Sequence, residues 1–125
     1  MIDPGARSTR RCPEALIHQA KRYIESHLGD TALDVAGIAA GVHVSPQHLQ
    51  RLFRTKGISL MRYVWQARLE RARLLLRALE PRNSSIQEIG WQCGFTTAAH
   101  FSRLFKQQYG VSPSDFRCAG VLVQP

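Results

Sequence analysis

Cysteine and histidine are the first side chains to consider as metal ligands or as a nucleophile and its base. No Cys-x-x-Cys or His-x-x-x-His pair occurs among them; they are Cys12, Cys93, Cys118, His18, His27, His43, His48 and His100. The cysteines are odd in number and far apart, which is typical of a reducing compartment. Since no nucleophile–base set, phosphate loop or carboxylate pair is visible either, we expect no enzymatic activity, metal or cofactor.

Basic side chains are the dominant chemical feature. Lys and Arg number 17 against nine Asp and Glu, which gives a net charge of +8 and a pI near 10.3 over 125 residues. From His43 to Arg77 there are eight basic residues and one acid. A solvated face more often mixes signs, so the excess predicts a polyanionic partner, and nucleic acid fits best. No apolar run is long enough to span a membrane or to form a signal peptide.

The sequence contains an internal repeat, so the helices expected to carry the basic side chains occur twice. Residues 35–63 match residues 86–116 at a spacing that grows from 51 to 53, as insertions in loops would produce. Arg51, for example, corresponds to Arg103, and Gly57 corresponds to Gly110. No segment alternates like a strand. We therefore expect an all-α fold of about seven helices, built from two copies of one helical lobe.

Helix start signals recur in both copies. Asp34, Ser45 and Thr97 are predicted N-caps, and Ser85 with Glu88 has the spacing of a capping box. In each copy, a short capped helix, a tight turn and a second helix form a helix-turn-helix motif.

A long apolar helix is expected between the copies, from about Leu60 to Leu79, with a length of about 30 Å. Its apolar residues fall in two stripes, which predicts packing from two sides. The first stripe is Leu60, Val64, Ala67, Leu74, Leu75 and Ala78, and the second is Trp65, Leu69, Ala72, Leu76 and Leu79. The simplest interpretation is a spacer that holds the two motifs at nearly one turn of B-DNA, roughly 34 Å.

Four large side chains near this helix are expected to be structural. Arg68 and Arg71 fall within its apolar arc and are predicted to be partly buried. Their expected partners are acids elsewhere in the fold: Asp34, Glu88 or Asp115. Trp65 and Trp91 follow the core stripes, so we expect them to pack rather than to stack on bases.

Three segments together resemble a known family. They are the paired motifs, the RLERARLLL stretch of residues 68–76, and the closing GFTTAAHFSRLFK and GVSP of residues 94–106 and 110–113. They look like the DNA-binding domain of AraC/XylS-type bacterial transcription regulators, over about residues 15–117. The resemblance implies that one monomer binds double-stranded DNA in two adjacent major grooves and regulates transcription, usually as an activator that meets RNA polymerase. Most members have a separate ligand-binding or dimerisation domain, so the chain is expected to be a small stand-alone member or a fragment, with any effector acting through that other domain.

The resemblance also places base-reading positions on the exposed faces of the two second helices. They are Gln47, Gln50 and Arg51 in the first unit, and Ala98, Ala99, Ser102 and Arg103 in the second. Arginine can donate two hydrogen bonds to guanine and glutamine can pair with adenine, whereas alanine can touch only a thymine methyl. We therefore expect the second unit to read fewer bases, mainly through Arg103. The alternative for each arginine is a phosphate contact or an intramolecular salt bridge.

Phosphate contacts are expected at the ends of the same helices. The helix N-termini at Ser45 and Thr97 offer backbone N–H groups, and Arg54, Lys56 and Lys106 offer cations. These contacts would give salt dependence without specifying sequence.

The predicted organisation is a tail, linker or cloning remnant at 1–12, helix-turn-helix lobes at 13–58 and 81–119, the linker helix at 59–80 and a second tail at 120–125. The predicted function is sequence-specific DNA binding in the bacterial cytoplasm, at the nucleoid. Two alternatives remain open. One is a basic helical module that docks proteins and does not read DNA sequence, and the other is a DNA-repair or modification protein that uses this module.

Overall fold

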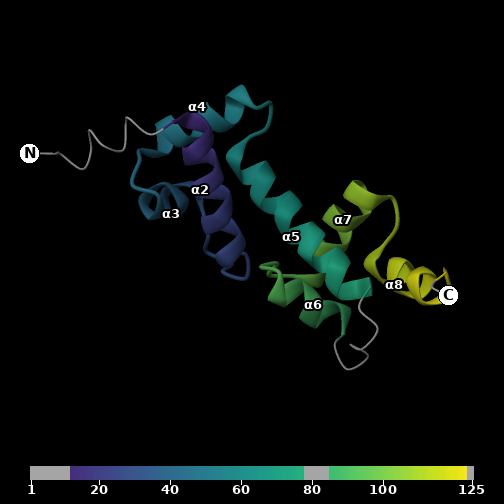
Figure 1. Ribbon diagram of the computed structural model, residues 1–125. Helices are drawn as coiled ribbons and strands as arrows, with labels where there is room; N and C mark the ends of the chain where they lie inside the picture. The colour runs from purple at the N-terminus through teal and green to yellow at the C-terminus, as the bar shows by residue number, and fades with distance from the viewer. Residues whose placement is uncertain (1–11, 78–84, 124–125) are drawn as a thin grey trace, which may run out of the picture. The chain divides into compact units, whose positions relative to one another are not determined.

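The computed structural model describes residues 12–77 and 85–123, with side chains as far as Ala119. Within these ranges the chain forms seven helices and no strand, which confirms the predicted all-α fold. The helices are α2 (Pro13–Ser26), α3 (Val35–Gly41), α4 (Pro46–Thr55), α5 (Leu60–Arg77), α6 (Ile86–Gln92), α7 (Ala98–Tyr109) and α8 (Pro113–Val123) (Figure 1). The predicted last residues of the linker helix lie outside the described ranges.

The chain divides into two compact units. Unit 1 comprises Met1–Leu28 and Ala32–Trp65, and unit 2 comprises Gly29–Thr31 and Gln66–Pro125. Helix α5 contributes its first six residues to unit 1 and the remainder to unit 2. Each unit therefore contains one helix-turn-helix motif, α3–α4 in the first and α6–α7 in the second.

Local capping bonds explain why the helices begin where they do. The Asp34 carboxylate accepts a hydrogen bond from the Gly37 N–H at 2.8 Å, and Ser85 and Glu88 form the predicted capping box. Two further caps were not predicted from the sequence. Ser59 and Ser112, which are repeat partners, precede α5 and α8, and each hydroxyl accepts an N–H three residues later at 3.1 Å.

The two cores differ in composition. The buried side chains of unit 1 are mostly aliphatic, with Phe53 the exception. Unit 2 is built on aromatic rings, in which Phe101 lies between Phe95 and Phe105 at centroid distances of 4.9 and 5.8 Å. All three of these rings are buried. Two of these rings, Phe101 and Phe105, belong to α7, so this helix supplies most of the aromatic cluster in unit 2.

The structure confirms that α5 buries apolar residues in unit 1 and in unit 2, but some residues predicted to be buried are exposed. Leu60 and Val64 are buried in unit 1, and Leu69, Ala72 and Leu76 are buried in unit 2. Leu74, assigned to the first stripe, is 55% exposed, because at 100° per residue it lies roughly 160° from Ala72 and Leu76. Trp91 on α6 is 50% exposed, so the prediction that it packs in the core is wrong.

Arg68 is a buried cation, but it is fully buried where partial burial was predicted, and its hydrogen bond goes to a backbone carbonyl that was not expected. The side chain is 1% exposed, and its guanidinium donates to the backbone carbonyl of Asp30 at 2.7 Å. Asp30 is not among the acids named as expected partners. Burial lowers the pKa of Arg68 from its usual value. Arg71, in contrast, is exposed, so its predicted partial burial is wrong.

Candidate nucleic-acid interface

The turns of the two helix-turn-helix motifs have the same hydrogen bonds. The Val44 N–H donates to the Ala39 carbonyl at 3.0 Å in unit 1, and the Phe95 N–H donates to the Gly90 carbonyl at 2.9 Å in unit 2. These residues correspond in the repeat. The structure thus confirms both motifs, and their turns share the same backbone hydrogen bond.

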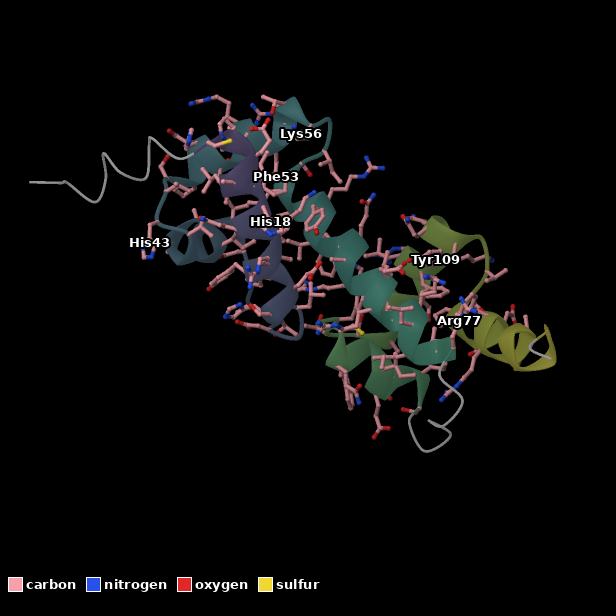
Figure 2. All side chains as sticks on the ribbon, viewed as in Figure 1. His18, His43, Phe53, Lys56, Arg77 and Tyr109 are labelled. Carbon is pink, nitrogen blue, oxygen red and sulfur yellow. The ribbon has the colours of Figure 1, made fainter. Side chains whose placement is uncertain are left out.

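The turns differ at the residue that adopts a left-handed conformation. His43 has φ 63°, whereas the corresponding residue in unit 2 is Gly94, with φ 94°. Figure 2 shows His43 on the turn between α3 and α4, where its side chain is exposed. A side chain with a Cβ atom costs free energy in this conformation, and glycine does not.

His43→Gly is therefore expected to raise the free energy of unfolding by about 0.5–1 kcal/mol, since relief of the strained φ outweighs the added freedom of the unfolded chain. Urea unfolding followed by circular dichroism measures the change. Gly94→Ala adds a Cβ atom at the equivalent position of the other turn, so it should lower the free energy of unfolding. A loss of stability in His43→Gly would show that its side chain makes a compensating contact.

Helix α4 presents a polar face without acidic residues. Gln47, Gln50 and Arg51 are exposed, while Leu49 and Phe53 are buried beneath them. Arg54 is exposed one turn after Gln50. The structure thus places the predicted base-reading residues of unit 1 on one accessible face.

Helix α7 presents a smaller and less polar face. Ala98, Ala99 and Arg103 are exposed and Ser102 is half-buried. Lys106 is exposed near the end of the helix. Among the residues that the structure describes, none forms an ion pair with either Arg51 or Arg103. Both arginines are exposed on the outer faces of their helices.

The position of α7 against α6 depends on the absence of a side chain at Gly90. A Cβ atom there would lie 2.9 Å from Cδ2 and 3.2 Å from Cγ of Phe101. The buried ring cannot step aside, since Phe95 and Phe105 pack against it. In unit 1 the corresponding pair is Ala39 and Leu49. Phe101 is larger than Leu49, and its neighbour Gly90 is correspondingly smaller than Ala39.

Gly90→Ala is expected to lower the free energy of unfolding by about 2 kcal/mol through overpacking. Adding Phe101→Leu, which recreates the pair found in unit 1, should recover about half of that loss. A double-mutant cycle in urea measures the coupling, and additivity within about 0.5 kcal/mol would contradict the proposed steric link.

The predicted phosphate-binding residues fall at the helix ends, with one complication. The hydroxyls of Ser45 and Thr97 accept the N–H groups of His48 and His100 at 3.1 Å, so they cap α4 and α7. The Lys56 Nζ lies 4.0 Å from Oε2 of Glu14 in an exposed ion pair. The Cys12 thiol and the Lys56 cation both lower the pKa of Glu14. Glu14 therefore competes for Lys56 with any external anion.

A polar cluster that was not predicted from the sequence fixes the end of α7. The Tyr109 hydroxyl donates to Oε1 of Glu70 at 3.2 Å, and Arg73 donates to both Glu70 oxygens at 3.0 and 2.6 Å. These bonds, chiefly that from Arg73, lower the pKa of Glu70. The spacing of Glu70 and Arg73 was a readable signal. Tyr109, 39 residues from Glu70, could not be assigned to the cluster from sequence.

The three cysteines differ in burial. Burial raises the pKa of Cys93 to about 11, which keeps its thiol neutral and unreactive near pH 7. Cys12 and Cys118 are exposed. Within the described residues, no group of three or more His, Cys, Asp or Glu is arranged to hold a metal ion. None of the helices described is long and apolar enough to cross a membrane.

Known proteins resemble this chain over most of its length. A family model described as a helix-turn-helix domain matches residues 38–119. The transcriptional activator RhrA of Rhizobium meliloti is 32% identical over 115 residues, which is 92% of this chain and 36% of RhrA. The arabinose operon regulatory protein of Escherichia coli is 38% identical over 102 residues, which is 81% of this chain and 34% of that protein. The chain thus spans about a third of the length of these curated relatives.

Solved structures agree with the sequence relatives. A transcriptional regulator from Chromobacterium violaceum, described as containing an AraC-type DNA-binding domain, superimposes with a TM-score of 0.79 at 31% identity, over 90% of this chain and 96% of that one. The DNA-binding domain of AdpA, solved in complex with a target DNA, gives a TM-score of 0.77 at 26% identity, over 87% of this chain and 96% of that one.

Proposed function

The chain belongs to the AraC family of helix-turn-helix DNA-binding domains, and from this premise we propose that it binds double-stranded DNA sequence-specifically and regulates bacterial transcription. The family is one of DNA-binding regulators and not of enzymes. Helices α4 and α7 are the recognition helices, and each enters one of two adjacent major-groove segments.

The observation that carries this proposal is the repetition of one exposed arginine. Arg51 and Arg103 occupy the same repeat position on the outer faces of α4 and α7, and neither is neutralised by a described residue. The repeat of the same cation on both second helices suits a partner that presents the same acceptor pattern at two places, as duplex DNA does. A guanine edge, with acceptors at O6 and N7, fits each of the two cations.

Roles within the interface follow from side-chain chemistry. In unit 1, Arg51 reads guanine, and Gln47 and Gln50 read adenine. In unit 2, Arg103 is the main reader and Ser102 supplies a second polar contact. Phosphates are bound by the remaining predicted set, which is Ser45, Thr97, Arg54, Lys56 and Lys106; the first two act through the N–H groups of the helix ends. Pro46 has no N–H group, so α4 offers fewer such donors than α7.

Activation is the regulatory outcome that we propose, because RhrA, which is similar to this chain, is named as a transcriptional activator. Activation requires contact with RNA polymerase, so we propose polymerase as a second partner. An effector would act through a domain other than this one. The protein works in the bacterial cytoplasm, at the nucleoid.

Selection from a random 30-base-pair DNA library at about 150 mM salt tests the proposal directly. We expect two enriched blocks centred about 10 base pairs apart, one for each recognition helix. Binding without any enriched sequence, lost uniformly as salt rises, would instead identify a basic docking module.

A further inference from the structure

The first turns of the two recognition helices differ in chemistry although they occupy the same place in the repeat. The first two helical residues are Pro46 and Gln47 in α4, and Ala98 and Ala99 in α7. Both alanines are exposed. A glutamine can exchange hydrogen bonds with a base edge, whereas an alanine offers only a methyl group.

An exposed methyl group at this place has a natural complement in the major groove. Thymine is the base that presents a C5-methyl group there, and contact between two methyl groups removes apolar surface from water. Cytosine methylated at C5 carries the same group at the same position. A bare cytosine or uracil leaves the alanine facing a gap.

We propose that Ala98 and Ala99 make α7 a reader of 5-methylpyrimidines, so that unit 2 selects thymine and accepts 5-methylcytosine in its place. This inference rests on the proposed DNA-binding function and specifies what the second recognition helix recognises.

The rest of unit 2 holds this methyl surface in a fixed place. The Thr97 hydroxyl caps the helix immediately before the alanines, and buried Phe101 anchors the opposite face against Gly90. Ala99 and Arg103 are four residues apart and share one helix face. Their Cβ atoms are about 6 Å apart, close to two base steps. The selected half-site should therefore contain a 5-methylpyrimidine within about two base steps of a guanine.

Replacement of thymine by deoxyuridine tests the inference, because it removes the methyl group and nothing else. Arg51→Ala and Arg103→Ala first show which enriched block each unit binds. Each variant should weaken the sequence preference within one block and leave the other block unchanged. Deoxyuridine at the assigned thymine of the unit 2 block should then weaken binding about fourfold, the ratio that corresponds to ~0.8 kcal/mol for one methyl group. The same replacement in the unit 1 block should change affinity by less than about twofold.

Variants locate the effect on the protein. The double variant Ala98→Gly and Ala99→Gly should bind the thymine and deoxyuridine duplexes equally, because both partner methyl groups are gone. Ala36→Gly is the matched control, since Ala36 is an exposed alanine at the same helical position of α3, and it should keep the fourfold preference. Ala99→Gln, which copies Gln47, should shift the preference at this base pair towards adenine.

A methylated duplex separates the two sources of the methyl group. Exchange of the T·A pair for C·G should weaken binding, and 5-methylcytosine at that position should recover about fourfold. Deoxyuridine sensitivity without this recovery would overturn the 5-methylcytosine half of the proposal. Two enriched blocks with no deoxyuridine effect would overturn the inference and leave the proposed function intact. An absence of enriched blocks would overturn the proposed function itself.

Discussion

Arg68→Ala is expected to lower the free energy of unfolding by about 3 kcal/mol. Arg68 is among the largest fully buried side chains of the chain, so truncation leaves a cavity. It also leaves the Asp30 carbonyl without the donor that now lies 2.7 Å away. Urea unfolding followed by tryptophan fluorescence and by circular dichroism would measure the loss.

Arg68→Met separates the two causes. Methionine restores much of the volume without a charge, and buried ionic groups can often be replaced by apolar ones at little cost. We expect this variant to lose less than about 1.5 kcal/mol. If Arg68→Met were as unstable as Arg68→Ala, the hydrogen bond to the Asp30 carbonyl, and not the packing, would be the main contribution of Arg68.

Arg51→Ala is expected to cost about 1–3 kcal/mol of binding free energy on a selected site, and to relax discrimination at one base step. The expected cause is the loss of the two hydrogen bonds that Arg51 is proposed to donate to a guanine. Titration of the variant against the selected duplex, against every base substitution in the unit 1 block, and against random DNA measures both effects.

Lys106→Ala is the matched control for a cation that contacts phosphate. It should weaken binding to all duplexes about equally and reduce the slope of log K against log salt by about one ion. If Arg51→Ala lost equal affinity for selected and random DNA, Arg51 would be a phosphate-contacting residue. Its proposed base-reading role would then be wrong.

Helix starts could be predicted from sequence because capping is a local event. Asp34, Ser85 and Thr97 each bond to an N–H group three residues later, so a short window contains the whole interaction. The internal repeat predicted the fold class and both helix-turn-helix motifs. The same repeat places Arg51 and Arg103 at equivalent positions, because it aligns the two second helices residue by residue.

Predictions that depended on distant neighbours did worse. Periodicity places Leu74 on the same side of α5 as Leu60, but it does not show whether another element covers that side at both ends of the helix. Leu74 and Trp91 are both largely uncovered. The partner of Arg68 is a backbone carbonyl, and nothing in a sequence marks one carbonyl among many as available. The bond from Tyr109 to Glu70 is likewise a product of the tertiary fold.

Gly29–Thr31 belong to unit 2, and this matters for the design of hybrid proteins from two relatives. These three residues lie between two stretches of unit 1, yet the Asp30 carbonyl accepts from Arg68, and a Cβ at Gly29 would come within 3.0 Å of the Gln92 carbonyl. A hybrid regulator made by one crossover after Trp65 would pair a grafted second motif with a foreign loop. Exchange of DNA specificity between relatives therefore needs two grafts, residues 29–31 together with the segment from Gln66 onwards.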